Sequence, residues 1–199
     1  MERYLIPVSR AAIDHGFQVG WKIYRDKQNF PSKWSASASK ELQADVFGFI
    51  AESVVCEHLG HEFPKLTAQR LDDYDLLING LKVDVKKVTY SRFSSKTKIT
   101  LNKKQFDRKK NKIDAFLFCN FEGSFTSESV GVLKIFIPIP NMGKLWVIGW
   151  IKSEDVTRLA TIHIWRDRDG KEIDKGYKLL EEDLRPISEL LEALKDGRK

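Results

Sequence analysis

The chain has 199 residues, of which 42% are hydrophobic and 31% charged, a composition that suits one folded domain and argues against general disorder. No apolar run approaches the roughly 20 residues that a membrane-spanning helix needs, and the charged N-terminus is unlike a signal peptide. The two cysteines, Cys56 and Cys119, lie in apolar stretches and are too few for a disulfide framework. We therefore expect packed free thiols and a reducing intracellular location, in the cytoplasm or with the nucleoid.

Positive charge is concentrated in one segment, residues 86–112. The whole chain has a net charge of +6, but this segment contains eleven Lys or Arg and a single acid, Asp107, so the rest is net negative. Such a segment usually indicates a polyanionic partner, because neutralising phosphates releases condensed counterions. The alternative is a solvated helix face and loop. The bases that we expect to contact phosphates are Lys87, Arg92, Lys96, Lys98, Lys103, Lys104, Arg108, Lys109 and Lys110.

The first half of the chain predicts a series of short elements. Residues 1–40 mix aromatic and basic side chains and predict no clear element. Residues 41–59 have apolar side chains at helical spacing and stop at Gly60, a typical residue after a helix C-terminus. The elements that follow are strands at 63–69 and on both sides of Asn79-Gly80, a strand at 99–101, a basic helix at 102–112 and a buried strand at 113–121.

The second half predicts mostly strands. They lie at residues 130–137, 145–151 and 161–166, with a short helix opening at 153–156 and an amphipathic helix at 186–195. No repeat or linker forces a division of the chain. We therefore expect a single domain over residues 1–199, with a core at 41–121, an N-terminal extension at 1–40 and C-terminal additions at 122–199.

The dipeptide Asn79-Gly80 fixes the register of the predicted hairpin. Asn-Gly between two strand-like runs is the strongest short signal for a two-residue turn, because both central residues need positive φ. In this register Asp75 lies directly opposite Asp84, and Asp73 lies opposite Lys86. Period-two alternation also places Lys86 on the same face as Asp84.

Facing aspartates need compensation. Their Cβ atoms would be about 4.5–5.5 Å apart, so the carboxylates repel, and a Mg²⁺ or Mn²⁺ ion would relieve this repulsion. With Lys86 beside Asp75 and Asp84, the set could cleave a phosphodiester. The metal would polarise the phosphoryl oxygen and acidify a water, while the ammonium orients that water or stabilises charge. The alternative is a solvent-facing strand end on which Lys86 only neutralises Asp84, since acid-x-base triplets are common by chance in so charged a chain.

These residues resemble the motif of the PD-(D/E)XK nuclease superfamily, which has the restriction-endonuclease-like fold. Glu52, in the predicted helix, matches the acid on the family's first helix. Asp75 matches the family's lone aspartate, and Asp84 with Lys86 matches its acid-x-Lys. The order helix, three strands, helix, strand over residues 41–121 is also that of the family core. The resemblance implies an α/β fold with a mixed central sheet and an αβββαβ core, extended by C-terminal strands and a helix.

The chain departs from the family pattern in two places. No proline precedes Asp75, and the acid of the acid-x-Lys triplet is Asp84 rather than the commoner Glu, which affects metal geometry. Asp73 is the rival for the role of Asp75. In several branches the second core helix carries a polar residue that faces the site, and Gln105 is the best-placed candidate here.

The resemblance implies a Mg²⁺- or Mn²⁺-dependent DNA endonuclease that leaves a 5′-phosphate. Its metal ligands would be Asp75, Asp84 and Glu52, and Lys86 and Gln105 would complete the catalytic set. Cutting both strands suits a two-fold homodimer, and with no P-loop pattern we expect no nucleotide cofactor. Two alternatives stay open, a structure-selective nuclease such as a Holliday-junction resolvase and a non-catalytic nucleic-acid-binding protein of the same fold. The charge argument applies to RNA as well as to DNA.

Overall fold

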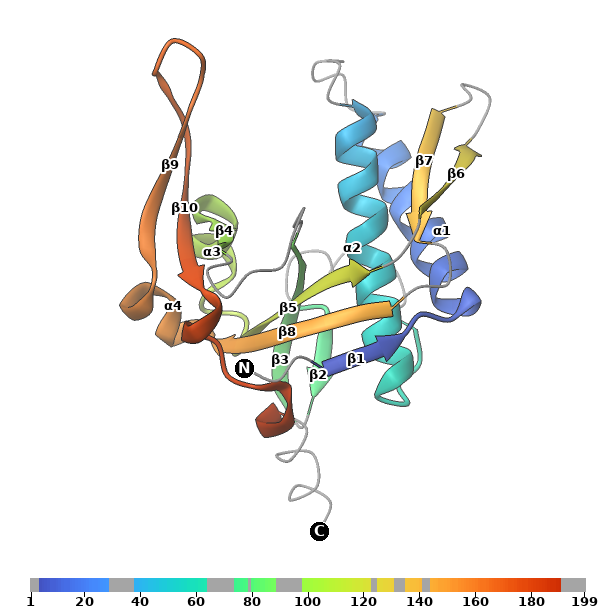
Figure 1. Ribbon diagram of the computed structural model, residues 1–199, viewed down its shortest axis with the longest axis horizontal. Helices are drawn as coiled ribbons and strands as arrows, with labels where there is room; N and C mark the ends of the chain where they lie inside the picture. The colour runs from blue at the N-terminus through green and yellow to red at the C-terminus, as the bar shows by residue number, and fades with distance from the viewer. Residues whose placement is uncertain are drawn as a thin grey trace. The chain divides into compact units, whose positions relative to one another are not determined.

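A computed structural model of the chain describes residues 4–28, 38–63, 74–78, 80–88, 98–122, 125–130, 135–140 and 144–190 (Figure 1). Its largest sheet has five strands, in the order β1 (Tyr4–Pro7), β8 (Lys144–Lys152), β5 (Ala115–Glu122), β3 (Leu81–Lys87) and β2 (Leu76–Ile78). This sheet is mixed, because β2 and β3 pair antiparallel whereas β3 and β5 pair parallel. The fold is therefore α/β with a mixed sheet.

The other described elements include two smaller sheets and four helices. One sheet has the order β4 (Lys98–Asn102), β10 (Glu172–Leu180) and β9 (Thr161–Arg166), and the other pairs β6 (Phe125–Val130) with β7 (Ile135–Pro140). The helices are α1 (Arg10–Gln28), α2 (Ala38–His58), α3 (Lys103–Lys109) and α4 (Ser153–Leu159), with a 3₁₀ turn at Glu181–Asp183. The chain divides into two compact units, and the single domain expected over residues 1–199 stays a prediction.

The first unit comprises residues 1–4, 67–119 and 147–199. Its core includes one face of the β4–β10–β9 sheet, together with buried side chains of β5, β8, α3 and α4. Ile99 pairs with Leu179 and Leu101 pairs with Tyr177, so these four side chains share the buried face. Phe106 of α3 covers them, with its ring centroid 4.9 Å from that of Tyr177. The opposite face of this small sheet is turned away from the core.

The second unit comprises residues 5–66 and 120–146, and α1 and α2 lie side by side in it (Figure 1). A Cβ at Gly16 of α1 would lie 2.4 Å from the Ile50 Cα, and one at Gly20 would lie 2.6 Å from the Val46 Cα. Only glycine allows the two helix backbones to approach so closely. In the apolar second half of α2, residues 46, 47 and 50–56 are buried.

Most of the predicted elements are confirmed, with shifted ends. The helix at 41–59 is α2, the basic helix is α3, and the strands at 99–101, 113–121, 145–151 and 161–166 are β4, β5, β8 and β9. The short helix at 153–156 is α4. The expected strand at 63–69 falls almost wholly outside the described residues, and of the C-terminal helix only residues 187–190 are described.

One expected strand was wrong, and two regions were left without a predicted element. The strand placed at 130–137 spans the end of β6 and the start of β7. Residues 1–40, for which the sequence predicted no clear element, contain β1, α1 and the start of α2. Strand β10 was missed because a bulge between Glu172 and Asp174, together with Gly176, breaks the period-two pattern that marks a strand.

The two cysteines are buried and free, as expected. Burial raises the pKa of the Cys119 thiol well above its usual value, so this group packs as a small apolar side chain. Among the described residues, no helix is both long enough and apolar enough to cross a membrane.

The close approach of α1 and α2 predicts that replacing Gly16 and replacing Gly48 by alanine change the free energy of unfolding in opposite directions. Gly16→Ala should lower the free energy of unfolding by about 1–3 kcal/mol, because the new methyl group meets the backbone of α2. Gly48→Ala should raise it by about 0.5–1 kcal/mol, because alanine favours the helix and no described atom lies within 4 Å of its Cβ. Urea denaturation of both variants tests this, and equal effects would contradict the packing described for α1.

Candidate active site

The β2–β3 hairpin has the register that a two-residue turn requires. Ile78 pairs with Leu81 and Leu76 pairs with Val83, as the sequence predicted. Gly80 has a φ of 79°, in the region that favours glycine, whereas Asn79 lies outside the described residues. The paired residues end at Leu76 and Val83, one position before Asp75 and Asp84, so the direct pairing of the two aspartates stays a prediction. Asp73, the rival candidate, also lies outside the described residues, so its pairing with Lys86 stays a prediction.

Asp75 continues the hairpin ladder with its side chain. It comes directly before β2, and its main-chain N–H donates to the carbonyl of Val83 at 3.0 Å. The Asp75 Oδ2 accepts a 2.7 Å hydrogen bond from the N–H of Val85 in β3. The carboxylate therefore takes the place of a strand carbonyl, which fixes its position beside β3.

Asp84 is the buried centre of the site, with 0% of its surface exposed. Its Oδ1 accepts a 2.5 Å hydrogen bond from the Lys109 ammonium of α3, and its Oδ2 forms an ion pair with Lys86. Within the described part of the chain, Oδ2 has no regular hydrogen bond besides this ion pair. Two cations from different elements therefore converge on one carboxylate.

The two aspartates have pKa values shifted in opposite directions. Burial, reinforced by the negative charge of Asp84, raises the pKa of Asp75 to about 6 against the opposing effect of both lysines. Burial also acts to raise the pKa of Asp84, but the charges of Lys86 and Lys109 outweigh it and hold that pKa below its usual value. Asp84 is thus ionised at neutral pH, and Asp75 changes its charge close to neutrality.

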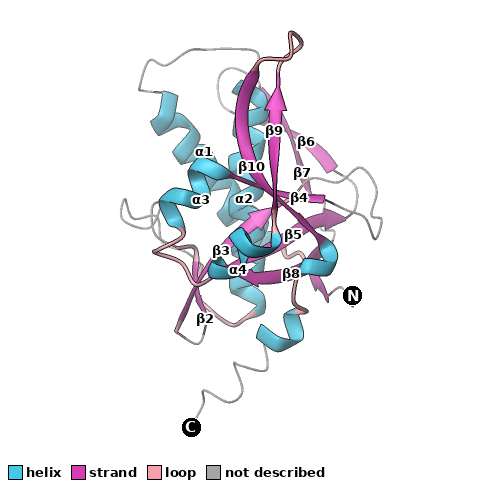
Figure 2. Ribbon diagram, turned by 90° about the vertical axis from the view of Figure 1, so that its left-hand side faces the viewer, coloured by secondary structure: helices cyan, strands magenta, loops and turns pink. Residues whose placement is uncertain are grey.

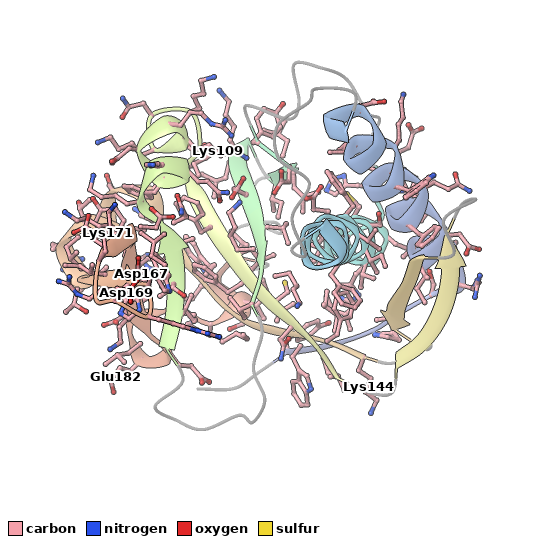
Figure 3. All side chains as sticks on the ribbon, turned by 90° about the horizontal axis from the view of Figure 1, so that it is seen from above. Lys109, Lys144, Asp167, Asp169, Lys171 and Glu182 are labelled. Atoms are coloured by element: carbon pink, nitrogen blue, oxygen red, sulfur yellow. The ribbon has the colours of Figure 1, made fainter. Side chains whose placement is uncertain are left out.

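Lys109 does not lie on the surface with the other bases of the segment 86–112, as the sequence had suggested. The sequence grouped it with the phosphate-contacting bases, but its side chain is only 9% exposed and is bonded to Asp84. Figure 3 labels it on the side of α3 that faces β3. The signal was present in the helical spacing, since Phe106, Lys109 and Ile113 follow one face of the α3 region and all three are buried.

Gln105 was expected to face the site, and in the structure it lines the same groove as Lys86. Its main-chain N–H donates to the Asn102 side chain, which caps α3. Its own side chain is exposed and borders, together with Lys86, a groove of about 550 Å³. Lys109 is therefore the α3 residue that touches Asp84, while Gln105 lines the groove beside it.

Another hollow of about 510 Å³ lies in the same unit, between the end of α3 and the start of α4. It is lined by Lys110 and Asp114 among others, but by none of Asp75, Asp84 and Lys86. Of these two hollows in the described residues, the groove bordered by Lys86 is the one that adjoins the predicted site.

Glu52, the predicted helix acid, lies in α2 and belongs to the second unit. It is buried, with 9% of its surface exposed. Its approach to the two aspartates, which the family resemblance implies, stays a prediction.

The other predicted phosphate contacts are of three kinds. Lys104, Arg108 and Lys110 are exposed on α3. Lys103 forms an ion pair with Asp107, and Lys87 is half-buried, so that burial lowers its pKa. Arg92, Lys96 and the side chain of Lys98 lie outside the described part of the chain, so their contacts with phosphates stay predictions.

The donor atoms at this site suit a small divalent cation. Among the described residues there is no group of three or more His, Cys, Asp or Glu side chains that could hold a metal. Mg²⁺, however, is commonly held by one or two carboxylates together with waters and substrate phosphates. Asp75 and Asp84 provide two such carboxylates on the β2–β3 hairpin, and the buried Oδ2 of Asp84 is held among those residues by the Lys86 ammonium rather than by a regular hydrogen bond. The residues present therefore fit such an ion.

The pairing of Lys109 with Asp84 can be tested by removing one charge. Lys109→Met keeps most of the side-chain volume but leaves Asp84 with Lys86 alone. We expect the free energy of unfolding in EDTA to fall by about 3 kcal/mol, as when one partner of a buried ion pair is removed. The matched control is Lys110→Met, at a neighbouring side chain that is 44% exposed, which should change this quantity by no more than about 0.5 kcal/mol. Urea denaturation measures both, and similar effects of the two substitutions would contradict the buried pairing.

The site was also compared with known proteins. No protein-family model, no curated protein and no solved structure in the comparisons matches this chain. Its interpretation therefore depends on its own residues and geometry.

Proposed function

We propose that the chain is a Mg²⁺- or Mn²⁺-dependent DNA endonuclease with a restriction-endonuclease-like core. One observation carries the proposal, the meeting of Asp75, Asp84 and Lys86 on the β2–β3 hairpin. A carboxylate pair with an ammonium group beside it is suited to phosphodiester hydrolysis. Few other reactions would use a carboxylate pair and a lysine next to a concentrated basic segment.

In this proposal the aspartates hold the ion. When bound, it would polarise the phosphoryl oxygen and acidify a water molecule. Asp84 is fixed by Lys109 from its buried side, and Asp75 is fixed by the N–H of Val85. Both carboxylates are thus held in position by contacts within the protein, which lowers the cost of organising the site.

Lys86 is suited to contact the substrate. Its side chain is 28% exposed, compared with 9% for Lys109, and it borders the groove. It can therefore contact Asp84 and still reach a phosphate or an attacking water at the groove. Its role would be to orient the water or to stabilise charge on the phosphate in the transition state.

The rest of the predicted machinery enters the proposal in supporting roles. Glu52 would extend the acidic site, Gln105 would contact substrate in the groove, and the exposed bases of α3 would follow the phosphate backbone. Release of a 5′-phosphate and a homodimer that cuts both strands belong to the same proposal.

A non-catalytic nucleic-acid-binding protein is the second candidate, and one observation favours it. Asp84 already has two cationic partners, so its charge is balanced without a metal. In that case the site would be a structural ion-pair cluster, and the basic segment would bind nucleic acid without cleaving it.

Cleavage assays with matched variants separate these candidates. The substrates are supercoiled plasmid, linear duplex, single strands and a four-way junction, each with Mg²⁺, Mn²⁺ or EDTA. We expect cleavage only with metal, and a loss of about a hundredfold or more in Asp84→Asn and Lys86→Ala. Lys82→Ala is the matched control, because Lys82 is an exposed lysine of the same strand, and it should retain full activity.

Each outcome of these assays has one interpretation. Cleavage that survives both Asp84→Asn and Lys86→Ala would refute the assignment of the site. Binding by the wild type without any cleavage would favour the non-catalytic protein. Preferential cutting of the four-way junction would identify a structure-selective nuclease such as a Holliday-junction resolvase.

A further inference from the structure

The groove beside Lys86 is formed by the outer face of the β4–β10–β9 sheet. Figure 2 shows these three strands adjoining one another, with β9 and β10 as a long hairpin. The inner face of this sheet is core, so side chains of the opposite parity point outward. Among them, Asn102 of β4 and Trp165 of β9 line the groove, together with Lys86, Lys87 and Gln105. Its volume of about 550 Å³ is in the range of sites that bind small molecules.

Trp165 is held against the sheet by a glycine. A Cβ at Gly176 of β10 would lie 2.4 Å from the Cη2 and 2.7 Å from the Cζ3 of the indole. The ring therefore occupies space that any other residue at position 176 would fill. His163 meets the ring edge-on, with centroids 5.0 Å apart and an interplanar angle of 89°. The indole is thus fixed by its own sheet, and part of its surface borders the groove.

Two carboxamides accompany the indole along the groove. The Asn102 side chain donates to Asp174 and accepts a 3.1 Å hydrogen bond from the Gln105 main-chain N–H, so its orientation is fixed. The Gln105 side chain is exposed and carries both a donor and an acceptor. Carboxamides of this kind pair with the edges of nucleobases.

Two consecutive lysines of β3 also line the groove. Lys86 lines it while contacting Asp84, and the adjacent Lys87 lines it as well. The groove therefore combines an aromatic ring, the exposed Gln105 carboxamide and two lysines, with the Asp174 carboxylate held by Asn102. A nucleotide has a complementary set of groups, namely a flat base and an anionic phosphate.

We propose that this groove holds one unpaired nucleobase stacked on Trp165, next to the phosphate at Lys86. The inference rests on the proposed function and narrows its substrate class to nucleic acid that is single-stranded, or carries an unpaired nucleotide, at the site of cleavage. A base paired within a duplex has both of its faces stacked and its edge occupied, so it could not enter such a groove without leaving the helix.

The test compares strands with and without bases. Fluorescein-labelled single-stranded DNA is compared with a strand of the same length whose central nucleotides are abasic, by fluorescence anisotropy in EDTA. We expect the wild type to bind the intact strand more tightly, because phosphates are common to both strands. Trp165→Ala should weaken binding of the intact strand about tenfold or more and leave binding of the abasic strand unchanged.

Two further variants serve as controls for the effect of Trp165→Ala. Trp165→Phe retains an aromatic ring and should restore much of the affinity, which a merely structural role of the indole would not require. Ile162→Ala removes a side chain that is 53% exposed on the opposite face of β9 and should leave both affinities unchanged. Circular dichroism shows whether each variant is folded.

Equal affinity of the wild type for the intact and the abasic strand would overturn the proposal. So would a Trp165→Ala variant that loses the same amount of affinity for both strands. If no strand binds and Trp165→Ala instead changes the oligomeric state, the groove is an interface between copies and the proposal is wrong. The binding assay needs neither metal nor cleavage, so its result can be interpreted even if the nuclease proposal fails. If binding depends on the base and on Trp165, but the separate assay with metal shows no cleavage, only the proposed function is refuted.

Discussion

Asp84 has no exposure to solvent, and a buried carboxylate is costly unless cations and hydrogen bonds compensate it. Here Lys86 on the same strand and Lys109 on α3 both contact it. This contact ties α3 to β3, so the helix that carries much of the basic segment is attached to the carboxylate site. Asp75 adds a second acid beside the cluster, and burial together with Asp84 raises the pKa of Asp75 to about 6. The site thus holds two neighbouring acids, and the charge of Asp84 is balanced by Lys86 and Lys109.

The two lysines differ in what they can do next. Lys109 is almost fully buried and holds Asp84 in place, whereas Lys86 lines the groove. A divalent ion at the proposed site would have to share or displace the partners of Asp84, and Lys86 is the more exposed of the two. In the proposed function Lys86 would couple metal binding to contact with a phosphate, and Trp165 would stack on the adjoining base.

The sequence predicted local features well and distant ones poorly. The turn at Gly80 and the alternation along β3 depend on neighbouring residues, so the hairpin register could be derived from them. The contact of Lys109 with Asp84 joins residues 25 positions apart, and its helical spacing was obscured by the neighbouring bases. The groove could not be predicted, because a bulge in β10 and Gly176 interrupt the alternation of side chains that marks a strand. Only pairing of β10 with β4 and β9 brings Trp165 to the same groove as Lys86.

Crystals soaked in a metal salt show directly whether Asp75 and Asp84 form a divalent-metal site. Anomalous diffraction from a crystal soaked in Mn²⁺ locates the ion independently of activity. We expect a peak within coordination distance of one oxygen from each aspartate, with Lys86 moved away from Asp84 and Lys109 still bonded to it. A map at saturating Mn²⁺ with no peak between the aspartates, and with both lysines still on Asp84, would refute the proposed metal site.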